Sequence, residues 1–177
     1  MAERDPIIGV FPGAFDPITH GHLDIIRRGS RLFNTLIVAV GRNPEKTELF
    51  SAAERVELLR ECTRDIPNVR VDSYEGLTAE YVRRQGARVI LRGIRDNVDL
   101  RGELRQANTN LLVGDVETVL LMTSDQHALT SSTLIKQIVE IGGYQPDRLS
   151  RLLPEIVQQR LEKKLHEQEQ ERLKAQG

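Results

Sequence analysis

Five short apolar runs, each followed by a segment with helical periodicity, limit what this chain of 177 residues can fold into. The runs lie at residues 7–11, 36–40, 69–71, 88–91 and 118–122. The second, fourth and fifth runs contain uninterrupted apolar stretches, which is typical of strands that are covered on both faces of a parallel sheet. We therefore expect the five runs to form a parallel five-stranded sheet.

Helical patterns separate the runs, at residues 20–33, 51–64, 78–85, 97–112, 132–141 and 154–174. Ser51 and Glu54 have the spacing of a capping box, and Gly86 follows the third pattern as a helix stop. Alternating strands and helices predict right-handed crossovers. The expected fold class is α/β: a Rossmann-like, doubly wound parallel sheet with helices on both faces and a helical C-terminus. We expect one domain over residues 1–165, and a polar, helical or disordered tail over residues 166–177.

Composition argues against several classes of protein. The formal net charge of -1 gives no support to non-specific nucleic-acid binding. We find no signal peptide, and no apolar run approaches the ~20 residues of a membrane span. The single cysteine, Cys62, leaves no disulfide framework. The expectation is a cytoplasmic protein without nucleic-acid or membrane partners.

The loop after the first run is the strongest candidate for a site. Ligands of doubly wound sheets bind beyond the carboxyl ends of the strands, and a glycine loop leading into a helix N-terminus holds phosphate. Gly13 allows close backbone approach, and His22 falls in the first helical turn. There it could donate a hydrogen bond to a phosphoryl oxygen. Two alternatives remain: an ordinary polar helix start, or a metal pair of His20 and His22, for which only His127 and His166 could add histidine ligands.

Three further loops carry candidate residues. Lys46 lies in the loop after the second run and could reach the ligand crevice. Arg92 and Arg95 flank Gly93 directly after the fourth run, and arginine suits the forked recognition of phosphate. Residues 130–133 offer a row of hydroxyl groups at a helix start, more than a single N-cap requires.

These motifs, taken in order, resemble a known family. The stretch FPGAFDPITHGH at residues 11–22, a loop lysine, RGIR at 92–95 and TSST at 130–133 look like the HxGH nucleotidyltransferase superfamily. Within it, residues 7–160 are similar to the bacterial phosphopantetheine adenylyltransferase family. The resemblance implies that residues 1–165 are a single nucleotidyltransferase domain. It also implies transfer of the adenylyl group of ATP to 4′-phosphopantetheine by in-line attack, without a covalent intermediate. The products are dephospho-coenzyme A and pyrophosphate, in the penultimate step of coenzyme A biosynthesis.

The resemblance also implies roles for individual residues. Catalytic roles fall to His22, as a stabiliser of the transition state, and to Lys46 and Arg92. Substrate-binding positions are Ala14, Lys46, Thr78 and Arg92. ATP-binding positions are Ala14, Phe15, His22, Gly93, Ile94, Arg95, Glu103, Ala128, Leu129, Thr130, Ser131, Ser132, Thr133 and Leu134. The implied cofactor is Mg²⁺, which travels with ATP rather than on metal ligands of the protein. The resemblance further implies that the protein assembles as a homohexamer and that coenzyme A binds it as a feedback ligand.

Several positions depart from the family pattern. Thr19 stands at the first histidine of HxGH, as is usual in this member of the superfamily, and Ala14 replaces the usual threonine or serine. Residues 99–103 keep Asp99 and Glu103 but gain Arg101, and His127 replaces an aromatic residue. Two alternatives therefore stay open: a sister nucleotidyltransferase that uses another phosphate acceptor, or a catalytically weakened homologue that binds nucleotide or coenzyme A.

Overall fold

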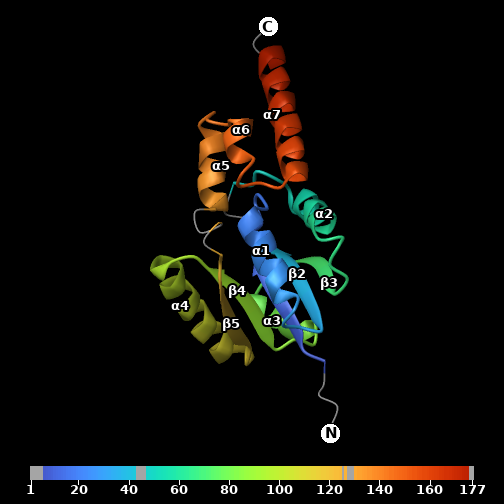
Figure 1. Cartoon of the computed structure of the whole chain (residues 1–177), viewed down its shortest axis with the longest axis vertical. Helices are drawn as coiled ribbons and strands as arrows, with labels where there is room; N and C mark the ends of the chain where they lie inside the picture. Colours follow the sequence, from blue (N-terminus) through green and yellow to red (C-terminus); the bar gives the residue numbers. More distant parts are fainter. Residues whose placement is uncertain (1–5, 43–46, 125, 127–129, 176–177) are drawn as a thin grey trace.

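A parallel sheet forms the centre of the molecule (Figure 1). The computed structural model describes residues 6–42, 47–124, 126 and 130–175, and within them the sheet has five strands in the order β3-β2-β1-β4-β5. The strands are β1 (Ile8–Gly13), β2 (Thr35–Gly41), β3 (Val69–Tyr74), β4 (Val89–Ile94) and β5 (Glu117–Met122). Every neighbouring pair is parallel. The expected doubly wound sheet is confirmed, and its winding reverses between β1 and β4.

Alternation along the strands explains why the apolar runs are continuous. In β2, Leu36 and Val38 belong to one buried cluster, while Ile37 and Ala39 belong to the cluster on the opposite face. Successive side chains of a strand point to opposite faces, so a central strand needs apolar residues at every position when both faces are covered.

Helices cover both faces, as expected. The helices α1 (His20–Gly29) and α2 (Ala52–Cys62) contribute their buried leucines and isoleucines to the cluster that contains Leu36 and Val38. The helix α3 (Thr78–Arg84) contributes to the other cluster, and α4 (Asn97–Gly114) packs beside α3.

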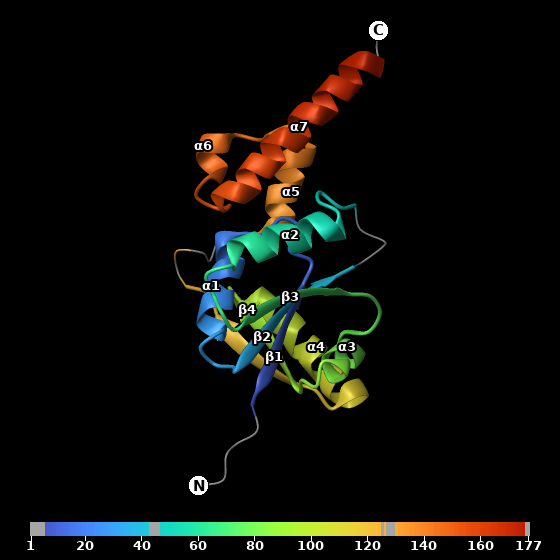
Figure 2. The ribbon, with the colours of Figure 1, turned by 90° about the vertical axis from the view of Figure 1, so that its right-hand side faces the viewer.

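The C-terminal helices lie beyond the carboxyl ends of the strands, next to α1 and α2 (Figure 2). They are α5 (Ser132–Glu140), α6 (Pro146–Leu149) and α7 (Glu155–Ala175). Buried side chains from α6 and α7, among them Leu149 and Leu161, join the same cluster as α1. The backbone N–H of His20 donates to the carbonyl of Leu152 at 2.9 Å, which ties this layer to the start of α1. No helix in the described part of the chain has the length and apolarity needed to cross a membrane.

Several elements differ from the sequence-based expectations. The first strand continues to Gly13, expected in the loop, because Gly13 still pairs with Val40 of β2. Residues 92–94, expected in a loop, lie within β4, because they pair with residues 120–122 of β5. The first helix ends at Gly29 rather than at residue 33, and the short helix α6 was not foreseen. The strand β3 continues to Tyr74 because it stays paired with β2 as far as Gly41.

Candidate active site

A cavity of about 520 Å³ opens at the carboxyl end of the sheet, where the winding reverses. The pairing of β1 with β4 covers only Gly9 and Val10 of β1, so the two strands are not paired further along. Arg92 of β4 bridges them there, because its Nη1 donates to the carbonyl of Pro12 at 2.5 Å. Parallel sheets bind ligands at this point of topological reversal.

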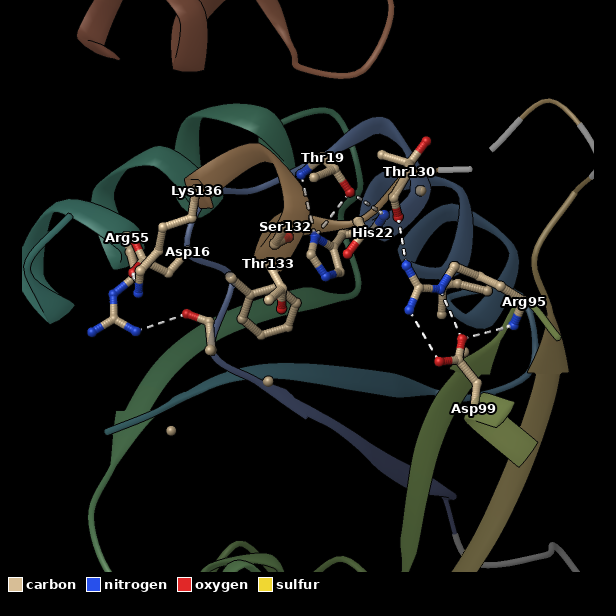
Figure 3. Close-up of a pocket in the computed structure, with 18 of the residues that line it drawn as sticks. Asp16, Thr19, His22, Arg55, Arg95, Asp99, Thr130, Ser132, Thr133 and Lys136 are labelled. Carbon is tan, nitrogen blue, oxygen red and sulfur yellow. Dashed lines mark hydrogen bonds and ion pairs between the residues drawn. The ribbon is translucent and has the colours of Figure 1, made fainter. Parts of the chain in front are cut away.

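His22 lies in the first turn of α1 and lines this cavity (Figure 3). Its Nδ1 accepts a hydrogen bond from the backbone N–H of Thr19 at 3.2 Å, and its own backbone N–H donates to Thr19 Oγ1 at 3.3 Å. These two bonds form a capping box that begins the helix. Because the Thr19 N–H can only donate, Nδ1 carries no proton, and neutral His22 has its proton on Nε2.

Burial, and to a lesser extent the positive charges of Arg92 and Arg95, lower the pKa of His22 from 6.5 to about 4. His22 is therefore neutral near pH 7. A neutral imidazole with Nε2–H can donate one hydrogen bond to an anionic oxygen in the cavity without needing to be ionised.

Two arginines on the β4 side are each held by a carboxylate. Arg92 Nε and Nη2 donate to the two oxygens of Glu103 at 2.7 and 2.6 Å. Arg95 Nε and Nη2 donate to Asp99 at 2.7 and 3.0 Å, and its Nη1 donates to the carbonyl of Thr130 at 3.0 Å (Figure 3). The hydrogen bonds from Arg95 lower the pKa of Asp99. Both guanidinium groups are thus oriented before any ligand arrives.

The N-terminus of α5 forms another wall of the cavity. Ser131 caps the helix through the backbone N–H of Leu134 at 3.4 Å, and Ser132 Oγ donates to the carbonyl of Pro17 at 2.8 Å. The second bond fixes α5 against the glycine loop. The hydroxyl of Thr130 is buried and has no hydrogen-bond partner within the described residues. A helix N-terminus with hydroxyl groups favours an anion.

Two cations of the cavity wall were missed by the sequence analysis. Lys136 of α5 forms an ion pair with Asp16 at 3.4 Å and a hydrogen bond with the carbonyl of Thr47. Arg55 of α2 is almost fully buried; it pairs with Glu48 at 2.5 Å and donates to the carbonyl of Ala14 at 2.8 Å. Lys136 could have been suspected, since it lies one helical turn after Ser132 and therefore on the same side of α5.

The structure brings most of the predicted site residues to this one cavity. Its lining includes Ala14, Phe15, His22, Arg92, Gly93, Arg95, Glu103, Thr130, Ser131, Ser132 and Thr133. Three others are not part of the lining. Ile94 is buried at the end of β4, Leu134 is about half exposed, and the hydroxyl of Thr78 bonds to the hydroxyl of Tyr74 at 2.8 Å. Lys46, Ala128 and Leu129, like His127, lie outside the described residues.

The alternative of a metal pair gains no support from the geometry. Nδ1 of His22 is occupied by Thr19. Within the described ranges, no group of three or more His, Cys, Asp or Glu side chains could hold a metal ion.

Comparison with known proteins first defines the class. The sequence profile of the cytidylyltransferase-like family matches residues 10–138, and the chain belongs to this class of nucleotidyltransferases. The structure of a putative nicotinate-nucleotide adenylyltransferase from Vibrio parahaemolyticus shares the fold. It has a TM-score of 0.60 and 17% identity, and the match covers 88% of this chain and 98% of that one.

Curated relatives then narrow the family. Proteins named phosphopantetheine adenylyltransferase are 48% identical in Gloeothece citriformis and 47% identical in Caldanaerobacter subterraneus. The first match covers 86% of this chain and 96% of the relative, and the second covers 89% and 96%. A third relative with that name, from Carboxydothermus hydrogenoformans, is 44% identical over 91% of this chain and 98% of its own. The chain is a member of the phosphopantetheine adenylyltransferase family.

Proposed function

We propose that the protein transfers the adenylyl group of ATP to 4′-phosphopantetheine and releases pyrophosphate and dephospho-coenzyme A. The observation that carries this proposal is a cavity at the sheet reversal with a neutral His22 beside two oriented arginines, in a chain of this family. Phosphoryl transfer depends mainly on positioning and electrostatic stabilisation, and these side chains supply both.

In the proposed reaction, a phosphate oxygen of 4′-phosphopantetheine attacks the α-phosphorus of ATP. A new P–O bond forms as the bond to pyrophosphate breaks, so no covalent enzyme intermediate is needed. The Nε2–H of His22 donates to an oxygen of the α-phosphate as negative charge develops. One such donor contributes about 10²–10³-fold in rate. Arg92 and Lys46 hold the acceptor phosphate, while Phe15, Arg95 and the start of α5 hold ATP.

Mg²⁺ fits this site as a companion of the nucleotide phosphates. Four carboxylates of the cavity wall are already engaged: Asp16 with Lys136, Glu48 with Arg55, Asp99 with Arg95, and Glu103 with Arg92. Mg²⁺ commonly keeps several waters and binds substrate phosphates rather than a cage of protein ligands. When bound, it neutralises part of the phosphate charge. The protein residues named above do the positioning.

We also propose that the protein assembles into a homohexamer. The edge strand β5 and the neighbouring helix α4 expose large apolar side chains, and such a surface favours association. They are Leu104, Leu111, Leu112, Val113, Val119 and Met122. Light scattering after size exclusion should give a mass near six chains, and Leu112→Asp should lower it; a monomeric wild type would contradict the assembly.

Two further expectations concern feedback inhibition and the location of the protein in the cell. We propose that coenzyme A, which contains the product within its own structure, competes for this cavity as a feedback inhibitor. We also propose that the reaction takes place in the cytoplasm, where ATP is available.

A pyrophosphate-release assay tests the function. ATP should support turnover with 4′-phosphopantetheine, whereas CTP, nicotinamide mononucleotide and glycerol 3-phosphate serve as comparison substrates. Turnover only with another acceptor would replace the proposed substrate. Tight ATP binding without turnover on any acceptor would indicate a non-catalytic homologue. As a check on the catalytic residue, His22→Ala should lower kcat far more than it weakens ATP binding.

A further inference from the structure

We propose that Thr19 is a positioning residue, which holds the imidazole of His22 in the Nε2–H tautomer and directs that N–H toward the cavity. The use of this N–H in catalysis rests on the proposed function. The holding of the tautomer is a property of the fold and can be tested without substrate.

Two hydrogen-bond donors of Thr19 meet the same nitrogen of His22. The backbone N–H donates to Nδ1 at 3.2 Å, and Oγ1 lies 3.1 Å from Nδ1. Oγ1 accepts from the backbone N–H of His22 at 3.3 Å. Its own hydrogen is therefore available for Nδ1, which has no proton to offer in return. The Thr19 side chain thus both caps the helix and supplies one of the two donors.

Turning the ring or moving its proton would break this arrangement. A half-turn of the imidazole would place a carbon against the Thr19 N–H and leave that donor unpaired, although Thr19 is only 1% exposed. A proton on Nδ1 would instead face the backbone N–H of Thr19, which can only donate. Of the two neutral tautomers and two ring orientations, only one combination satisfies Thr19.

Aromatic rings confine the imidazole from another side. Phe15 contacts it edge-on, with ring centroids 5.0 Å apart and an interplanar angle of 67°, and Phe11 lies 6.5 Å away. Phe15 adopts a φ of 50°, which is uncommon for a non-glycine residue. A Cβ at residue 13 would lie 3.0 Å from the Phe15 ring, so a glycine at this position leaves room for that ring beside His22.

The charged groups around His22 also favour the neutral imidazole. Arg92 and Arg95, on the β4 side, both disfavour the doubly protonated imidazolium. Their carboxylate partners, Glu103 and Asp99, are hydrogen-bonded to the guanidinium groups. Thr19 then decides which of the two neutral forms is present (Figure 3).

Nitrogen NMR on the ¹⁵N-labelled wild type tests the tautomer directly. At pH 7 we expect Nδ1 of His22 to resonate as an unprotonated ring nitrogen and Nε2 as a protonated one. A His22→Gln variant assigns the signals. A protonated Nδ1, or averaged shifts that indicate tautomer exchange, would overturn the inference. Because no substrate is needed, a lack of turnover with 4′-phosphopantetheine would count against the proposed function alone.

Substitutions at Thr19 test its role. Thr19→Val keeps the shape but removes the hydroxyl. Because the backbone N–H of residue 19 remains, the variant should weaken the preference for the Nε2–H tautomer, seen as a shift of the His22 nitrogen signals toward averaged values, and lower kcat about 10–100-fold, within the effect of losing one stabilising donor, while KM for ATP changes less than about threefold. Thr19→Ser restores the hydroxyl and should return kcat to within about threefold of wild type. A Thr19→Val enzyme with unchanged tautomer and unchanged kcat per folded molecule would show that Thr19 only caps the helix.

A second capping box in the same chain provides the matched control. Ser51 accepts from the backbone N–H of Glu54 at 3.3 Å, and the Glu54 carboxylate accepts from the Ser51 N–H, so α2 begins as α1 does. Ser51→Ala should lower stability in urea as a lost cap does. It should leave the His22 nitrogen spectrum and kcat as in wild type. If Ser51→Ala changed the spectrum as much as Thr19→Val, the effect would be general loosening and the inference would fail.

Discussion

Replacing His22 with glutamine should remove part of the acid sensitivity of this protein. Burial, together with Arg92 and Arg95, lowers the pKa of His22 from 6.5 to about 4. The unfolded chain therefore takes up a proton on His22 below pH 6.5, whereas the folded protein does not until about pH 4. Stability from this residue is fully present above pH 6.5 and is lost as the pH falls through this window.

The size of the effect follows from the two pKa values. Linkage between 6.5 in the unfolded chain and about 4 in the fold gives a loss of about 2 kcal/mol between pH 7 and pH 5. Glutamine does not titrate, and its amide oxygen can still accept from the Thr19 N–H, because Gln is a normal third residue of a capping box. The variant should keep α1 but lose this pH dependence.

Urea unfolding at pH 7, 6 and 5 measures the difference. Between pH 7 and pH 5, the unfolding free energy of wild type should fall by about 2 kcal/mol more than that of His22→Gln. Carboxylates titrate in both proteins and cancel in this comparison. His166→Gln, on the exposed part of α7, is the control for histidine loss. If the unfolding free energies of wild type and His22→Gln fell equally between pH 7 and pH 5, the pKa of His22 would not be lowered in the fold, and the neutral imidazole that the site requires would be refuted.

Four further outcomes are expected, the first three measured by urea unfolding. Glu103→Gln should lower the unfolding free energy by about 1–3 kcal/mol in urea, because it removes the charge from the forked hydrogen bonds to Arg92; unchanged stability would mean that the pair contributes nothing. Gly29→Ala should cost about 1–3 kcal/mol, because its Cβ would lie 2.3 Å from a buried leucine of β4. Gly102→Ala, which meets open space within α4, should instead stabilise by about 0.5–1 kcal/mol. Ala14→Thr should tighten 4′-phosphopantetheine roughly tenfold by calorimetry, since it adds a hydrogen bond to a charged group; unchanged affinity would argue against the assigned place of that residue.

The sheet could be predicted from the sequence because its determinants are local. Continuous apolar runs such as 36–40 reflect burial on both faces, and the capping box at Ser51 marks where α2 begins. The ends of the strands were less predictable. Arg92 and Gly93 look like loop residues, yet pairing with β5 keeps them in the strand. The four-residue helix α6 is too short to show a periodicity.

The site was predictable only as a set of loops at one edge of the sheet. Its internal partners join residues that are far apart in sequence, such as Lys136 with Asp16, and no periodicity or motif indicates such a pair. In the sequence, Arg55 looks like an ordinary charged residue of a helix. Only the fold shows that it is buried and that it donates to the carbonyl of Ala14. The bond from Thr19 to His22 was also missed, because a histidine is not the usual third residue of a capping box.

The bond between the His20 N–H and the Leu152 carbonyl has a consequence for the order of assembly. During synthesis, the glycine loop and α1 are made well before Leu152 and the buried side chains of α7. The first turn of the helix that carries His22 thus receives one of its backbone partners only after Leu152 has been made. The start of α1, which carries His22, therefore depends for its full set of backbone hydrogen bonds on a segment that is made much later.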